Sequence, residues 1–361
     1  MNKRRIEIGL LLSRSGSYSL IAEACRNGFF AAIAQINGNP EIDIAFVPIE
    51  RNPGGNADAY GPLCEDILRN STARHVIGCT TSWSRKEVIP SLEKLGGTLW
   101  YPAPYEGFEA SDHVVYTHAC PNQHLLPLLD WVFPAYGRRA YLAGSNYIWG
   151  WEMSRLARET TLAAGGEVLG ERYLPLGSRD VGRMIDEIRA TRPSFILNSL
   201  IGPSSYEFMA ALHDLGQADP HFAPNRCPVL SCNLTECELP ALGQAAEGLI
   251  AAGPYFRGAT QWPGQGGFGS SHEAASFAAV TELARLIAHR PGAEQDSLSS
   301  LLNHSTSPMI DPKTHHTLLP VLIAQVRGGA FEVMQDRGMT QGDPYLTRLP
   351  ERSVPQLRVV S

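Results

Sequence analysis

A strand–helix–strand pattern over residues 75–100 constrains the fold more than any other part of the sequence. Short apolar runs at 75–78 and 97–100 flank an amphipathic helical pattern at 86–95, which predicts a βαβ unit with parallel strands. Loops at 78–82 and 101–109 follow the two strands. Because ligands bind at the carboxyl ends of the strands in open parallel sheets, these loops are the first candidates for ligand contact.

The same alternation of strands and helices runs through the rest of the chain. At 361 residues the chain exceeds the size of about 250 to 300 residues at which single cores stop growing. We therefore expect an α/β protein of two doubly wound, mainly parallel lobes. The predicted strands lie at 6–12, 42–47, 75–78, 97–100, 114–118, 139–143, 167–173, 195–200, 229–231 and 249–252, with a hairpin at 318–334. The predicted helices lie at 20–36, 58–68, 86–95, 123–133, 152–164, 181–190, 205–215 and 271–288.

Breaks in this pattern predict where the chain passes between the lobes. Proline and glycine interrupt it near Cys120 and near Gly253, and a glycine pair lies at Gly328. We expect three crossings at these points. The predicted lobes are 1–120 with 254–316 and 121–253 with 317–345, followed by a tail at 346–361.

Composition and charge argue against several classes of protein. The net charge is −6 and the basic residues are scattered, so direct binding of nucleic acid is not expected. No run approaches the ~20 apolar residues that span a bilayer. The start of the chain is basic, but it leads into an apparent first strand rather than a signal-peptide core. With an odd set of seven cysteines, the sequence favours a cytoplasmic protein without a disulfide framework.

Motifs for catalysis, metals or cofactors are weak. Cysteines 227, 232 and 237 and the set His113, His118, Cys120 and His124 lack metal-ligand spacing. Residues 264–269 match G-x-G-x-x-G, but no strand precedes them, so we expect a flexible surface connection over 257–269 rather than a dinucleotide site. No G-x-S-x-G elbow occurs. We expect no cofactor, no metal and no enzymatic activity, although a dispersed Cys–Glu–Lys amidase site is harder to exclude.

The loop at 101–109 carries a resemblance to a known family. Its sequence, Tyr-Pro-Ala-Pro-Tyr-Glu-Gly-Phe-Glu, resembles the corresponding segment of the AmiC-type amide sensors, which are cytoplasmic relatives of the branched-chain amino-acid and amide-binding proteins of ABC importers. Weaker similarities occur at 52–55, 65–70, 78–86 and 144–148. The resemblance implies a type I periplasmic-binding-protein fold with the ligand between two lobes.

A candidate pocket follows from the loops after the strands. Hydroxyls, phenols and an amide can satisfy a small neutral amide, and aromatic rings and proline can enclose its apolar tail. Of the residues that the resemblance places in the pocket, Ser82, Tyr101, Pro104 and Tyr147 keep the family's residue types, whereas Thr80, Ala103, Trp149 and Asn233 differ. The complete predicted set is Thr80, Ser82, Tyr101, Ala103, Pro104, Tyr147, Trp149, Ile201 and Asn233.

The resemblance also implies a function. We expect a cytoplasmic sensor that binds a small amide, or a related urea or nitrile-derived amide, and controls an amide-degrading operon through a partner. The implied partner is an RNA-binding antiterminator protein. The sequence leaves open whether the protein also forms a homodimer. The alternative is the solute-binding subunit of an ABC importer for amides, urea or branched-chain amino acids.

Overall fold

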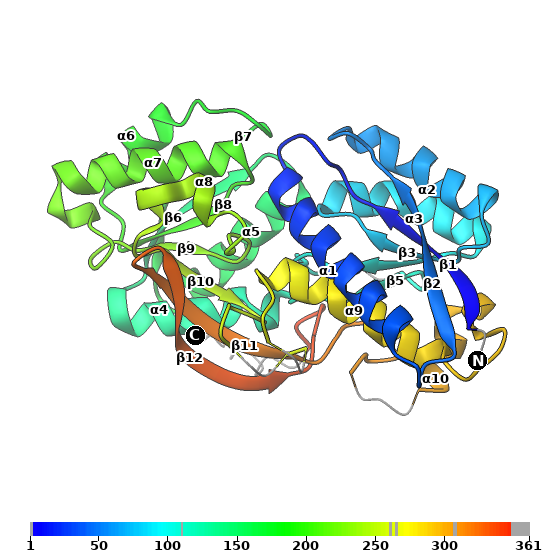
Figure 1. Ribbon diagram of the computed structural model, residues 1–361. Coiled ribbons are helices and arrows are strands. Elements are labelled where there is room, and N and C mark those ends of the chain that lie inside the picture. The colour runs from blue at the N-terminus through cyan, green and yellow to red at the C-terminus, as the bar shows by residue number, and fades with distance from the viewer. Residues whose placement is uncertain (1–2, 110, 260–261, 264–265, 306–308, 348–361) are drawn as a thin grey trace, which may run out of the picture.

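Two lobes lie side by side in the computed structural model of the protein (Figure 1). The structure describes residues 3–109, 111–259, 262–263, 266–305 and 309–347. Each lobe is a β-sheet with helices on both faces. The predicted fold class, two doubly wound α/β lobes, is confirmed.

The first lobe contains a five-stranded parallel sheet in the order β2-β1-β3-β4-β5. Its strands are β1 (Arg4–Leu11), β2 (Ile44–Arg51), β3 (His75–Gly78), β4 (Thr98–Tyr101) and β5 (Val114–Tyr116). Apolar residues of α1 and α9 pack on one face, and those of α2 and α3 pack on the other. The helices of this lobe are α1 (Ser19–Gly38), α2 (Tyr60–Asn70), α3 (Ser82–Leu95), α9 (Ser271–Ile287) and α10 (Leu298–Asn303).

The second lobe repeats this order and adds an antiparallel hairpin, giving the seven-stranded sheet β12-β11-β10-β9-β8-β6-β7. Its strands are β6 (Arg139–Ser145), β7 (Glu167–Leu174), β8 (Phe195–Ser199), β9 (Val229–Ser231), β10 (Ile250–Gly253), β11 (Leu319–Arg327) and β12 (Ala330–Thr340). The helices are α4 (Leu125–Tyr136), α5 (Ile148–Ala163), α6 (Gly182–Thr191), α7 (Pro203–Ala218) and α8 (Leu239–Leu242). Short 3-10 turns also occur, η1 (Ala57–Ala59) and η5 (Ala293–Gln295) in the first lobe and η2 (Pro121–Gln123), η3 (Pro220–Phe222) and η4 (Gly243–Ala246) in the second.

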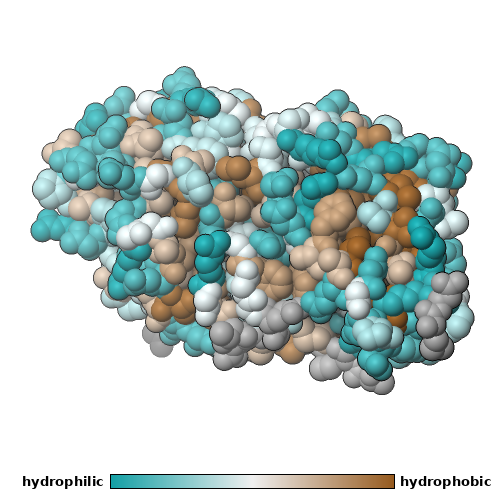
Figure 2. Space-filling model, viewed as in Figure 1, coloured by the Kyte–Doolittle hydropathy of each residue, from teal (hydrophilic) through white to brown (hydrophobic). Residues whose placement is uncertain are grey.

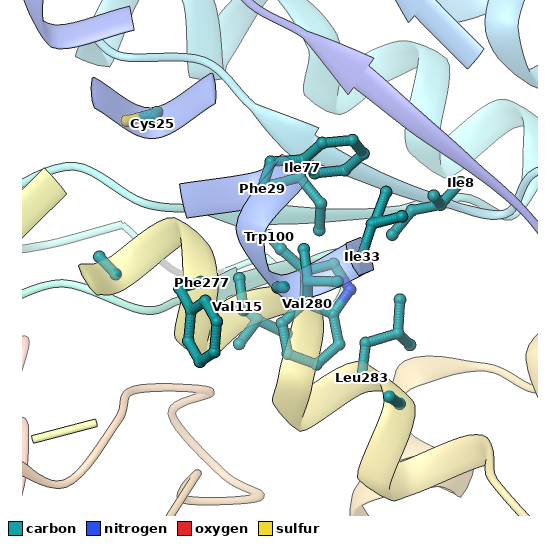
Figure 3. Packing of buried hydrophobic residues seen from close by; sticks show 14 of the residues in the cluster. Ile8, Cys25, Phe29, Ile33, Ile77, Trp100, Val115, Phe277, Val280 and Leu283 are labelled. Carbon is teal, nitrogen blue, oxygen red and sulfur yellow. The ribbon is translucent and has the colours of Figure 1, made fainter. Parts of the chain in front are cut away.

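The core of the first lobe explains why α9, far along the chain, belongs beside α1. Figure 3 shows Phe29 and Ile33 of α1 facing Val280 and Leu283 of α9, with Trp100 of the sheet beneath them. These side chains are almost entirely buried. Burial of apolar side chains contributes about 1.5–3 kcal/mol for each one, so this contact holds α9 beside α1.

The third connection between the lobes differs from the prediction. Gly328 and Gly329, with φ of 58° and 82°, form the tip of the β11–β12 hairpin inside the second sheet. The crossing expected at Gly328 is therefore wrong. The chain instead leaves the first lobe before β11, where His316 bridges to Tyr116 of β5.

The segment at 257–269 also differs from the expected outer-surface connection. Residues 260–261 and 264–265 lie outside the described residues, and the latter pair is the first two positions of the G-x-G-x-x-G match. Trp262 and Phe268, however, are 3% and 7% exposed and belong to the core that contains α1 and α9. The large apolar side chains of this segment anchor it to the first lobe.

The face seen in Figure 2 carries hydrophilic residues over most of both lobes, interrupted by smaller apolar patches. Across the described part of the chain, no helix is both long enough and apolar enough to cross a membrane.

Candidate ligand-binding site

A small cavity lies between the lobes, at the carboxyl ends of strands from both sheets. Its volume is about 20 Å³, which is room for about one water molecule. The structure brings eight of the nine predicted residues together around it, while Ala103 packs in the core of the first lobe instead. The lining residues are Ile21, Thr80, Thr81, Ser82, Tyr101, Pro104, Tyr147, Trp149, Ile201, Asn233 and His272.

On the side of the first lobe, a tight turn leads from β3 into α3. Gly78 has φ 149°, and a Cβ there would lie 2.2 Å from the Leu11 carbonyl oxygen, so only glycine fits. The Thr81 side chain then caps α3 by accepting a hydrogen bond from the Ser84 backbone N–H at 3.0 Å. The helix thus begins at Ser82, four residues before the predicted start, and its N-terminus faces the cavity.

On the side of the second lobe, α5 also begins at the cavity. Tyr147 is its N-cap residue and Trp149 lies in its first turn, whereas the sequence predicted a loop here and a helix from 152. Glycine disfavours a helix interior, but a Cβ at Gly150 would lie 2.0 Å from the Ser145 carbonyl oxygen. Gly150 therefore permits close packing of the first turn against β6, and the helix forms despite its low propensity.

Asn233 lines the cavity, and its amide is held in place by the protein. Its Nδ2 donates to the Leu200 carbonyl oxygen at 3.1 Å, and its Oδ1 accepts from the Ser231 hydroxyl at 3.3 Å. Both ends of the amide are therefore held by the protein. Asn233 shapes the wall. The buried Nε1–H of Trp149 has no hydrogen-bond partner in the described part of the chain and is available to a ligand.

The 101–109 loop surrounds a buried arginine. Arg85 is fully buried, and its guanidinium pairs with Glu106 at 2.7 Å and with Glu109 at 2.8 Å. Its Cζ also lies 4.8 Å from the ring centres of both Tyr101 and Tyr105. Most of the nonapeptide thus builds a support beneath the cavity, and its Tyr101 and Pro104 reach the cavity wall.

Sequence reasoning missed Ile21, Thr81 and His272. The signal for His272 was available, because Ser270 and Glu273 predict the start of a helix and the helix returns to the first lobe. Burial lowers the pKa of His272 to about 4, so its imidazole is neutral at pH 7. None of the described residues that line the cavity is Lys, Arg, Asp or Glu. The arrangement therefore suits an uncharged ligand.

Comparison with known proteins now defines the class. Residues 6–265 match the periplasmic binding protein domain family, and the chain belongs to that family. Its fold is that of the type I, Leu/Ile/Val-binding-like members.

Solved structures of solute-binding proteins share this fold at low sequence identity. One from R. palustris, in complex with 4-hydroxybenzoate, has a TM-score of 0.80 and 17% identity over 95% of this chain and 99% of its own. The branched-chain amino acid transporter protein LivJ from Streptococcus pneumoniae, in complex with isoleucine, has a TM-score of 0.73 and 14% identity over 94% and 100%. An amino acid transporter binding protein from Pseudomonas fluorescens has a TM-score of 0.75 and 17% identity over 98% of both chains.

Proposed function

We propose that the protein is a sensor that binds a small neutral amide, or a related urea, between its lobes. The observation that carries this proposal is the uncharged but polar cavity wall. It combines hydroxyls, phenols and the free indole N–H of Trp149 with no Lys, Arg, Asp or Glu among its described residues. Such groups satisfy a carbonyl and an NH₂ group without requiring a buried charge to be balanced.

The size of the cavity also favours a small ligand. With a volume of about 20 Å³ in the present arrangement, even an amide of a few heavy atoms requires the lining side chains to move. A larger ligand requires a correspondingly larger displacement of buried aromatic side chains.

The regulatory part of the proposal rests on the resemblance of the 101–109 loop to the AmiC-type sensors. We infer a cytoplasmic protein, in keeping with its seven cysteines. Ligand binding would change its affinity for an RNA-binding antiterminator that controls an amide-degrading operon. The buried Arg85 cluster links the resembling loop to the start of α3, so the shared residues would preserve the geometry of one cavity wall.

A solute-binding subunit of an ABC importer is the second candidate. The N-termini of α3 and α5 both lie at the cavity, and backbone N–H groups at helix N-termini stabilise anions. This feature favours a carboxylate ligand, as in the relatives bound to hydroxybenzoate and isoleucine.

A thermal-shift screen separates these candidates. The panel would contain acetamide, butyramide and urea, together with butyrate, 4-hydroxybenzoate and isoleucine, with calorimetric titration of each hit. A ligand that binds only the native state stabilises it by about 2.7 kcal/mol at a hundred times its Kd. We expect a shift with an amide or urea; a response to carboxylates alone would contradict the neutral-ligand proposal.

A further inference from the structure

His272 enters the cavity wall from an element that sequence reasoning did not connect with the site. It lies in the first turn of α9, which Ser270 caps by accepting from the Glu273 backbone N–H at 3.4 Å. The helix is held tightly against α1, since a Cβ at Gly28 would lie 2.0 Å from the Glu273 carbonyl oxygen. The position of the imidazole is therefore fixed by the core of the first lobe.

In two other buried histidines, a hydrogen bond from a backbone N–H determines which ring nitrogen carries the proton. His118 accepts the Ala119 N–H at Nδ1 over 2.8 Å, so its Nε2 carries the proton and donates to the Ser271 hydroxyl at 3.1 Å. His124 likewise accepts the Leu125 N–H at Nδ1, and its Nε2 donates to the Tyr105 carbonyl oxygen at 3.1 Å. Both rings are therefore neutral, and both nitrogens of each ring are hydrogen-bonded within the protein.

His272 differs from these two although its ring centre lies only 5.2 Å from that of His118. Neither ring nitrogen has a hydrogen-bond partner of ordinary geometry among the described residues, and the side chain is 1% exposed. The carbonyl groups of Pro102 and Asn233 lie close enough to favour a proton on the ring, but burial outweighs them. A neutral imidazole carries one donor and one acceptor. Within the described part of the chain neither makes a hydrogen bond of ordinary geometry, and the nearby carbonyl groups can accept only from the donor.

We propose that His272 is a specificity-determining residue, which uses one donor and one acceptor nitrogen to select a ligand that offers both a carbonyl oxygen and an N–H group. This inference rests on the proposed function and specifies its ligand chemistry. A primary amide or a urea satisfies both nitrogens, together with the free indole N–H of Trp149. A carboxylate offers acceptors only and a ketone has no N–H, so each leaves a buried polar group unsatisfied.

The test compares butyramide with 2-pentanone, which has nearly the same shape but lacks the NH₂ group, and with butyrate. Calorimetric titration of the wild-type protein should show butyramide binding about tenfold or more tightly than either analogue. His272→Leu should lower butyramide affinity by about tenfold and abolish the preference over 2-pentanone. His272→Gln should keep butyramide affinity within about threefold of wild type, since a side-chain amide also offers a donor and an acceptor.

His75→Gln is the matched control, because His75 is a buried neutral imidazole of the first lobe that does not line the cavity. It should leave the ligand preference unchanged. Equal affinity of the wild type for butyramide and 2-pentanone overturns the inference even if His272→Leu does not fold. Equally weak binding by folded glutamine and leucine variants also overturns it, because the role would then be structural. If butyrate binds and neither neutral ligand does, the proposed function itself fails.

Discussion

At the scale of single residues, Arg85 and its partners support the wall of the cavity. A buried guanidinium is tolerated only when carboxylates and aromatic faces replace water. Glu106 and Glu109 supply the carboxylates, while Tyr101 and Tyr105 supply the faces. Because the Arg85 guanidinium contacts the ring of Tyr101, this cluster holds Tyr101 in the cavity wall.

Removing one carboxylate from this cluster should be costly. In Glu106→Gln, the fully buried Arg85 loses the negative charge of its 2.7 Å partner, and we expect the free energy of unfolding to fall by about 3–5 kcal/mol. Urea denaturation measures this change. Glu332→Gln is the control, because its pairing with Arg327 is exposed and should contribute about 0–1 kcal/mol. Similar losses in both variants would contradict the structural role of the cluster.

Two aromatic residues of the cavity should be required for binding. Tyr147→Ala and Tyr101→Ala each remove a wall, and we expect butyramide affinity to fall by about tenfold or more. Since Tyr101 also contacts Arg85, thermal unfolding should be measured beside the titrations. Tyr136→Ala, at the far end of α4, is the control; unchanged affinity in both cavity variants would remove this site from consideration.

Glu238 should make stability depend on pH. Burial raises the pKa of this carboxyl from its ordinary 4.5 to about 7, so between these values the folded state holds a proton that the unfolded state has released. The free energy of unfolding should therefore fall as pH rises from about 4.5 to about 7. Glu238→Gln should reduce this slope and stabilise the protein at pH 8 by up to about 3 kcal/mol. The remaining slope comes from Glu236, whose pKa burial also raises to about 7. A slope unchanged by the substitution, measured by urea denaturation across this range, would contradict the assignment.

The candidate site could be predicted in part because its residues follow strands directly. Thr80, Tyr101 and Tyr147 are placed by local sequence order, and the sheet topology then brings them together. His272 could not be placed in this way, because it enters through packing of α9 on α1. Ala103 follows a strand as Tyr101 does, yet it packs inward, since which way a loop side chain faces depends on tertiary contacts.

At the scale of elements, fold class followed from the strand–helix alternation, and most errors lie at helix starts. The α3 start was missed because its cap pairs Thr81 with Ser84, whereas the usual box has Glu or Gln at the later position. The α5 start was missed because Gly150 reads as a loop residue, although it serves close packing on β6.

The segment around Phe268 tests the corrected placement of residues 257–269. Phe268 packs on Tyr255 and Phe277, with ring centres 5.9 Å and 4.8 Å away. Phe268→Ala should therefore lower the free energy of unfolding by about 3–5 kcal/mol. Met339→Ala is the control, because Met339 is 44% exposed on β12 and should change it by less than about 0.5 kcal/mol. An unaltered urea midpoint in Phe268→Ala would restore the outer-surface placement of this segment.

At the scale of the whole molecule, the cavity wall is divided between two rigid lobes. Ser82 and Tyr101 come from the first, and Tyr147 and Trp149 from the second. A further contact joins the lobes at the surface, where the Arg155 guanidinium of α5 lies 4.8 Å from the ring centre of Phe108. Opening the lobes would separate these groups, so the ligand and the Phe108–Arg155 contact both favour the closed arrangement.

The Phe108–Arg155 contact, which we call the latch, should contribute to ligand affinity without touching the ligand. Arg155→Met removes the cation–π contact and should weaken butyramide binding by about two- to fivefold, since such exposed contacts are worth about 0.5–1 kcal/mol. The matched control is Arg158→Met on the same helix, because Arg158 pairs with Glu171 inside the second lobe. Equal effects of the two substitutions on calorimetric affinity would show that the latch plays no part in closure.

Ligand should therefore shift the whole protein toward the closed form, and small-angle scattering should show a smaller radius of gyration with saturating butyramide. A regulatory partner that binds the open form better would be released by the ligand, with a coupling of about 1–3 kcal/mol. By reciprocity, that partner would weaken ligand binding by the same factor. Arg155→Met should raise the radius of the ligand-free protein and strengthen partner binding. If the radius is indifferent to ligand and the affinity is indifferent to partner, the cleft binds its ligand without acting as a switch.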